Sequence, residues 1–176
     1  GEGGFKNEHQ PSLFAATQHV GAILRPADGQ SGLPRGLRVG EPVSQVDFLP
    51  TFCDLAGLDA PAGMQGISLV PLLHGAGGTA RGLYMEAFST PLLDKRLQGW
   101  WQDGWKYVRA LDGTESLFSS ATGDAVDWAA REPERLVALR DALELALAAM
   151  PEAHPSSRAL SAEDRRALTE LGYAGG

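Results

Sequence analysis

Four histidines are the side chains best suited to proton transfer or metal binding near neutral pH. His74 and His154 stand beside glycine or proline at the ends of expected elements, which favours exposure to solvent. His19 begins an apolar run and is most simply explained as the first residue of a strand. His9 differs because it lies in a glycine-rich segment before a buried strand, where α/β proteins often place ligand-binding groups. We therefore keep His9 as the candidate for binding or acid–base chemistry, beside the alternative that it is an ordinary loop residue.

Asp47 and Cys53 lie close together between residues 43 and 57, so a catalytic pair is one interpretation of this stretch. A capped helix that buries one stripe of side chains is the better one. Ser44 and Asp47 can both accept the free amides of a first turn. If Asp47 is the cap, Pro50 lies in the first turn, where it costs no hydrogen bond, and Gly57 suits the left-handed position after the end. The expected buried stripe is Leu49, Phe52, Cys53 and Ala56.

An aromatic group follows later in the chain, formed by Trp100, Trp101, Trp105 and Tyr107. These rings could stack on sugars or bases, but alternating aromatics on a small sheet more often form its packing face. We expect the packing role, with Lys106 and Arg109 as solvated alternates between the rings.

Composition limits the possible functions. The 176 residues carry a net charge of −7, which argues against general affinity for nucleic acid or anionic membranes because no basic surplus is present. Cys53 is the only cysteine, so neither an intrachain disulfide nor a cysteine zinc cluster can form. The longest apolar runs are too short to span a bilayer, so we expect no transmembrane segment.

The expected elements form two groups. The first holds strands over 19–25 and 37–43, a helical turn over 13–17, the capped helix described above and a short helix over 68–75. The second is a small antiparallel sheet, with strands over 82–88, 97–101, 105–109 and 115–118 and Asp-Gly turns at 103–104 and 112–113. A helix from Pro133 to Met150 follows, with a leucine stripe at 136, 139, 143 and 147. A last short helix is expected over 161–172.

Five segments, taken in order, resemble motifs of the sulfatase family within the alkaline phosphatase superfamily. The stretch 43–57, VSQVDFLPTFCDLAG, resembles V-S-x-x-D-x-x-P-T-x-x-D-x-A-G. The others are MQGISLVPLL at 64–73, GWKYVR at 104–109, ESLF at 115–118 and the tail LSAEDRRALTELGY at 160–173. The resemblance covers nearly the whole chain.

The resemblance implies an α/β fold class: the C-terminal part of an alkaline-phosphatase-like sandwich, followed by a small antiparallel sheet with a packed C-terminal helix. Three parts are expected. Residues 1–78 would end the sulfatase-like α/β domain, 79–150 would form the small sheet with its helix, and 151–176 would be a linker with a short helix.

The resemblance also implies where site residues lie. Gly1-Glu2 resembles the last half of a metal motif, and His9 matches the His or Lys that contacts the sulfate in the family. Gln10, Ala15 and Gly21 depart from the family pattern. The formylglycine precursor, a Cys or Ser in C-x-P-x-R, and the metal-binding aspartates of the family are absent from this sequence. No complete catalytic set, metal site or cofactor site is therefore expected here; Ca²⁺ or Mg²⁺ and formylglycine are expected in a full-length parent.

The implied function is that of a C-terminal fragment of a sulfatase-like hydrolase. The parent would hydrolyse a sulfate monoester, with the missing N-terminal catalytic portion as partner, and the chain alone would be inactive. One alternative is a phosphodiesterase or phosphonate-monoester hydrolase of the same superfamily; another is a stand-alone binding or accessory module. The resemblance favours a periplasmic or secreted location.

Overall fold

The computed structural model describes residues 13–25, 33–77, 81–87, 96–150, 161 and 166. His9, Glu2 and His154 lie outside these residues, as does nearly all of the helix expected over 161–172. Among the described helices none is long and apolar enough to cross a membrane.

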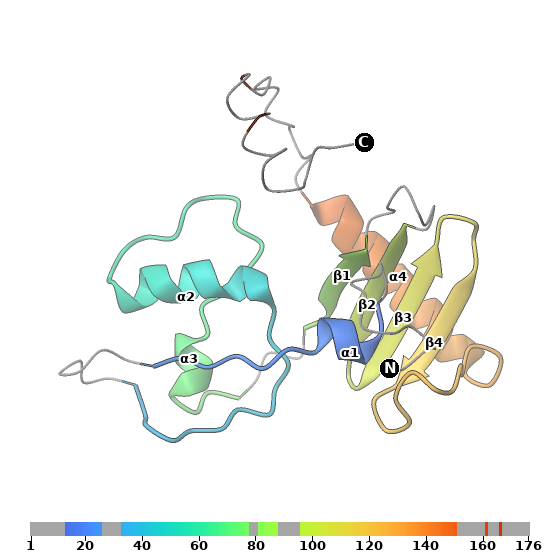
Figure 1. Ribbon diagram of the computed structural model, residues 1–176, viewed down its shortest axis with the longest axis horizontal. Coiled ribbons are helices and arrows are strands. Elements are labelled where there is room, and N and C mark those ends of the chain that lie inside the picture. Colours follow the sequence, from blue (N-terminus) through green and yellow to red (C-terminus); the bar gives the residue numbers. More distant parts are fainter. Residues whose placement is uncertain are drawn as a thin grey trace.

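A four-stranded antiparallel sheet forms the second half of the chain (Figure 1). Its strands follow one another in sequence order, so each pairs with the next. They are β1 (Leu83–Ala87), β2 (Leu97–Gln102), β3 (Trp105–Ala110) and β4 (Glu115–Ser119). The predicted sheet is confirmed, and its boundaries agree with the predicted ones to within about a residue.

The turns of the sheet follow from the Asp-Gly pairs. Asp103 and Gly104 both have positive φ, 50° and 78°, as a two-residue hairpin between β2 and β3 requires. Gly113, with φ of 84°, occupies the next turn, where Asp112 Oδ1 accepts the amide of Thr114 at 2.9 Å. A side chain at Gly113 would be strained in this conformation.

Helix α4 (Pro133–Ala149) covers one face of the sheet (Figure 1). The buried core between them consists of Tyr107, Leu117, Leu139 and Leu143, with Tyr84, Trp100, Trp105, Trp128, Leu136 and Leu147 packed around it. The predicted leucine stripe is therefore confirmed. The packing role of the aromatic group is confirmed for three of its members; Trp101 alternates with them and lies on the other face, paired with Lys106.

The opposite face of the sheet corrects the prediction for Lys106, which is buried and not solvated. Its ammonium group donates to the carbonyl of Leu13 at 2.6 Å, forms an ion pair with Asp124 and lies 5.2 Å from the ring centre of Phe118. The alternation of the strand placed Lys106 away from the aromatic face, as expected. What strand periodicity could not reveal is that the chain before α1 (Ala15–Gln18) covers this second face.

The first half of the chain has a shorter set of elements: a 3₁₀ turn η2 (Gln45–Asp47), α2 (Phe48–Leu55) and α3 (Val70–Leu73). The predicted end of α2 is confirmed. Gly57 has φ of 67°, its amide donates to the carbonyl of Asp54 and the amide of Leu58 donates to that of Cys53, which is a Schellman motif.

The predicted buried stripe of α2 is wrong. Leu49 and Phe52 are 54% and 53% exposed, whereas Asp47, Pro50 and Thr51 are buried. Helical spacing correctly predicts an apolar face, but burial needs a second surface to pack against. The described residues place α3 and the 66–69 segment against the polar side of α2 instead.

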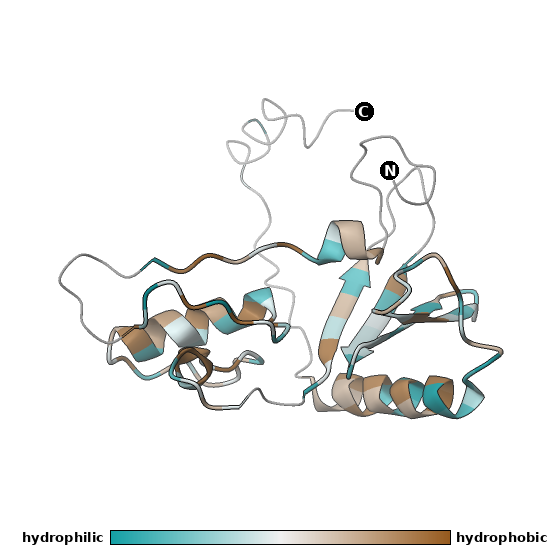
Figure 2. Ribbon diagram, turned by 90° about the horizontal axis from the view of Figure 1, so that it is seen from below, coloured by the Kyte–Doolittle hydropathy of each residue, from teal (hydrophilic) through white to brown (hydrophobic). Residues whose placement is uncertain are grey.

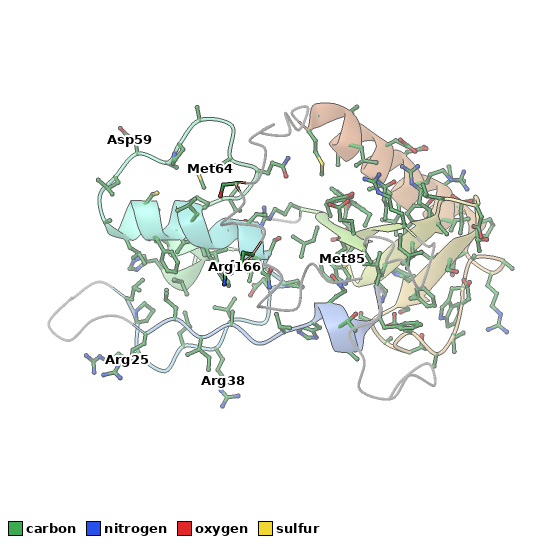
Figure 3. The ribbon with its side chains drawn as sticks, turned by 45° about the horizontal axis from the view of Figure 1, so that its top comes forward. Arg25, Arg38, Asp59, Met64, Met85 and Arg166 are labelled. Carbon is green, nitrogen blue, oxygen red and sulfur yellow. The ribbon has the colours of Figure 1, made fainter. Side chains whose placement is uncertain are left out.

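The strands expected over 19–25 and 37–43 are also wrong, because none of these residues belongs to a strand. Ile23 is 97% exposed. A strand requires a neighbour for its backbone groups, and none of the described residues pairs with these segments. In Figure 2 the ribbon is coloured as hydrophobic at several places along the extended segment and on α2. Arg25 and Arg38 project at the periphery (Figure 3).

Candidate functional site

The histidines do not form a site within the described part of the chain. His19 and His74 are both exposed, at the ends of α1 and α3. Among the residues that the structure describes, no three His, Cys, Asp or Glu side chains lie close enough together to hold a metal ion. These residues therefore do not fit a divalent metal site, and the expected sulfate contact of His9 lies outside the described residues.

Asp47 is the centre of a buried polar cluster. Its side chain has no exposed surface. One carboxylate oxygen accepts the amide of Ser44 at 2.8 Å, and the other accepts the amide of Ile67 at 3.0 Å. Arg81, just before β1, forms an ion pair with the same carboxylate. Asp47 therefore does more than cap a turn: it connects α2, the 66–69 segment and the entry to the sheet.

Thr51 and Asp54 extend this cluster along α2. The Thr51 hydroxyl donates to the carbonyl of Asp47 at 2.6 Å and accepts the amide of Leu69 at 2.9 Å. Ser68 donates to Asp54 at 2.5 Å. A Cβ placed on Gly66 would lie 1.9 Å from the carbonyl oxygen of Val46, so only glycine permits this approach.

These contacts explain two of the sequence motifs together. The polar residues of the 43–57 stretch bind the backbone and side chains of the 64–73 stretch. We name the set Asp47, Thr51, Asp54, Gly66, Ser68 and Arg81 the polar latch. Its chemistry is hydrogen bonding to backbone groups that would otherwise be buried without partners, which is a structural role and not a catalytic one.

A second polar group lies between the sheet and α4. Arg140 donates to both carboxylate oxygens of Glu115, at 2.7 and 2.6 Å, and the Tyr107 hydroxyl donates to the same carboxylate at 2.5 Å. These bonds, that of Arg140 first, hold the pKa of Glu115 below its usual value. Burial and the neighbouring carboxylate raise the pKa of Tyr107 to about 12. Glu115 is therefore ionised and Tyr107 neutral over the whole physiological range.

Arg109 continues this group on β3. Its Nε and Nη2 donate to Gln98 Oε1 at 3.0 and 2.7 Å, and its Nη1 forms an ion pair with Glu144 on α4. The prediction of Arg109 as a solvated residue is therefore corrected, since its guanidinium group binds Gln98 and Glu144. No feature of the sequence singles out Arg140. Strand alternation could have predicted the position of Arg109, because residues 105, 107 and 109 of a strand lie on the same face.

We compared the sequence and the fold of this chain with those of known proteins. No protein-family model matches the chain. Arylsulfatase K of Danio rerio is 37% identical over 65 residues, which are 37% of this chain and 12% of that protein. A sulfatase structure from Bacteroides thetaiotaomicron matches with a TM-score of 0.53 and 27% identity, over 58% of this chain and 24% of the other. This chain is a relative of the sulfatases.

The matched region is only a part of each sulfatase. It spans about an eighth of arylsulfatase K and about a quarter of the bacterial structure. A phosphonate monoester hydrolase from Silicibacter pomeroyi has the same fold over 75% of this chain and 30% of its own, with a TM-score of 0.60 and 20% identity. The mixed α/β architecture with a four-stranded sheet and packed helix is that of the C-terminal regions of these enzymes, as the sequence motifs predicted.

Proposed function

We propose that this chain is the C-terminal part of an enzyme that hydrolyses sulfate monoesters. The observation that carries the proposal is the combined likeness to a bacterial sulfatase, 27% identity with a TM-score of 0.53 over 58% of the chain. The formylglycine nucleophile and the Ca²⁺ or Mg²⁺ ligands would come from the remainder of that enzyme. In such enzymes the cation polarises the sulfate oxygens and supports the nucleophile.

The proposed contribution of this chain is support for the catalytic part and one contact to substrate. His9 would donate a hydrogen bond to a sulfate oxygen, a role that follows from its match to the family motif. We also propose a division of the chain at 78 and 150. The apolar core of the sheet and helix lies within 84–147, and every residue of the polar latch except Arg81 lies before residue 78.

Exposed apolar side chains on the first half support a larger parent. Ile23, Leu24, Leu49 and Phe52 are all at least 40% exposed. Large apolar side chains that gather on a protein surface usually mark an interface with another protein segment. We propose that the catalytic portion covers it, and that the whole enzyme works in the periplasm or outside the cell, as the family resemblance suggests.

Phosphonate-monoester hydrolysis is the second candidate, because the hydrolase from Silicibacter pomeroyi shares the fold over the larger share of this chain. A stand-alone sugar-binding module is less well supported. Tyr107 has no exposed surface, and Trp100 and Trp105 pack against the buried core, so these rings are not available as a stacking platform.

Activity of the full-length protein that contains this chain is the direct test. We expect it to hydrolyse 4-nitrophenyl sulfate faster than 4-nitrophenyl phenylphosphonate, with loss of turnover after chelation of divalent cations. The 176-residue chain by itself should show no turnover, and activity in it would contradict the proposal. Faster phosphonate hydrolysis would favour the second candidate, and no hydrolysis of either ester would favour the module.

His9 can be tested in the same full-length enzyme. His9→Ala should lower kcat/KM for the sulfate ester by about a hundredfold, the usual cost of removing one donor to a reacting oxyanion. His19→Ala is the matched control, because His19 is exposed at the end of α1, and it should leave kcat/KM unchanged. Equal effects of the two changes would remove His9 from the site.

A further inference from the structure

An ion pair is buried on the face of the sheet that α4 does not cover. It joins Lys106, on β3, to Asp124, in the loop after β4, and the two side chains are 10% and 6% exposed. Taking two charges out of water is costly, and their mutual attraction repays this cost only when further hydrogen bonds satisfy the remaining polar atoms. The question is therefore what supplies those bonds.

Both charges bind the backbone of the segment that leads into α1. Lys106 Nζ donates to the carbonyl of Leu13 at 2.6 Å, and Asp124 Oδ2 accepts the amide of Ala15 at 2.5 Å. Figure 1 shows α1 on the side of the sheet opposite α4. Hydrogen bonds with one charged partner are roughly twice as strong as neutral ones. The ion pair therefore fixes two points on one backbone, two residues apart.

The side chain of Leu13 anchors the same segment to the sheet. Leu13 is only 3% exposed. A Cβ placed on Gly99 of β2 would lie 2.9 Å from Leu13 Cδ1, so Leu13 occupies space that is open because position 99 has no side chain. We name the set Leu13, Gly99, Lys106 and Asp124 the lysine clamp.

The clamp lies close in sequence to His9, which precedes Leu13 by four residues. Because an extended chain spans at most about 3.6 Å per residue, the Cα of His9 is confined to within about 14 Å of that of Leu13. Pro11 stands between them, and proline restricts its own φ and the residue before it. Fixing Leu13 to the sheet therefore restricts where His9 can be placed.

From these contacts we propose that Lys106 and Asp124 are positioning residues for His9. They act through the backbone of residues 13–15 and not through contact with substrate. The inference rests on the proposed function, in which His9 donates a hydrogen bond to a sulfate oxygen. A donor of this kind must be held where negative charge develops, and a small displacement lowers the rate strongly.

Hydrogen exchange in the full-length enzyme tests the clamp. Lys106→Met keeps the aliphatic stem and removes the ammonium group, and it should speed exchange about tenfold or more in a peptide that covers residues 13–18. Arg135→Met is the matched control, because each cation lies over an aromatic ring, Arg135 over Trp105 and Lys106 over Phe118. It should leave exchange over 13–18 unchanged. Unchanged exchange in Lys106→Met would overturn the inference.

Kinetics with 4-nitrophenyl sulfate test the positioning role in the same enzyme. Lys106→Met should lower kcat/KM about tenfold or more, mainly through kcat, because the displaced donor acts in the transition state. In an enzyme that already carries His9→Ala, Lys106→Met should lower kcat/KM less than twofold. A merely structural role would give equal factors with and without His9, so equal factors would overturn the inference.

A second variant leaves the charges of the clamp in place. Leu13→Ala removes the anchor beside Gly99 and should lower kcat/KM about fivefold or more when His9 is present, and less than twofold when it is absent. Leu111→Ala is the matched control, since Leu111 is 72% exposed, and it should change kcat/KM less than twofold. A loss in Leu13→Ala that does not depend on His9 would contradict the role proposed for the clamp.

Failure of this inference differs from failure of the proposed function. An unaltered enzyme that does not hydrolyse the sulfate ester would overturn the proposed function and the positioning role together. Hydrolysis that depends on His9, but not on Lys106 or Leu13, would overturn the positioning role alone.

Discussion

The two halves of this chain are held together in opposite ways. In the sheet and α4, large side chains such as Tyr107, Leu117 and Leu143 are completely buried against one another. In the first half, the completely buried side chain is the carboxylate of Asp47, while Phe52 and Ile23 are exposed. The second half therefore buries its own apolar surface, whereas the first half is organised by hydrogen bonds and presents apolar surface outward.

The largest expected effect comes from the core of the second half. Leu143→Ala should lower the free energy of unfolding by about 2–5 kcal/mol, because it leaves a cavity at a completely buried position. Leu145→Ala is the matched control on the same helix, since Leu145 is 74% exposed, and it should change stability by no more than about 0.5 kcal/mol. Denaturant unfolding measures both, and equal effects would contradict the core assigned here.

The polar latch should show the next largest effect, confined to the first half. Asp47→Asn removes the charge that pairs with Arg81 and replaces one of the two oxygens that accept the amides of Ser44 and Ile67 with an NH₂ group, which cannot accept. The expected cost is about 2–3 kcal/mol. Hydrogen exchange should show lost protection at Ser44 and Ile67, with protection in β3 retained. Asp59→Asn, at the edge of the first half (Figure 3), is the control. Equal loss of protection in β3 would mean that the halves unfold as one unit.

A smaller effect is expected at Tyr107, and it depends on pH. The folded pKa of about 12 lies above the ordinary 10.0, so the stabilisation from the neutral phenol is complete below pH 10.0 and is lost as pH rises toward 12. Tyr107→Phe should cost about 1 kcal/mol at neutral pH and should remove this part of the alkaline loss. Unfolding curves at neutral and alkaline pH measure it. An unchanged alkaline loss in the variant would assign it to other groups.

The smallest effect on stability is expected on the exposed face of α2. Phe52→Ser should change the free energy of unfolding by less than about 0.5 kcal/mol, because the side chain is 53% exposed. It should nevertheless reduce self-association, since exposed apolar surface favours association between copies and this change removes part of it. Sedimentation velocity measures this, with Leu111→Ser in the sheet region as the control. Equal reduction by both changes would show that self-association does not occur through the exposed face of α2 in particular.

Much of the second half could be predicted because its signals are local. Asp103-Gly104 alone determines a tight hairpin, since both residues need positive φ. Pro133 and the leucines at helical spacing determine α4 and its buried face. The polar site at its edge was missed because Arg140 and Glu115 are 25 residues apart, and no sequence period connects a helix to a strand.

In the first half, the predicted strands and the predicted buried face of α2 were wrong because both depend on a neighbouring surface that the sequence does not reveal. Residues 19–25 are apolar enough for a buried strand, but a strand forms only where a neighbour accepts its hydrogen bonds. Likewise, the spacing of Leu49 and Phe52 predicts an apolar face of α2 without supplying the surface that would bury it.

By itself the sequence determined the turns, the helix ends and the order of motifs that relate this chain to the sulfatases. Only the tertiary structure decided what the polar residues in those motifs do. Asp47 accepts the amide of Ile67 and forms an ion pair with Arg81. Lys106 is buried, donates to the carbonyl of Leu13 and forms an ion pair with Asp124. Local conformational preference is a property of neighbouring residues, whereas a buried charge is tolerated only when distant segments bring it a partner.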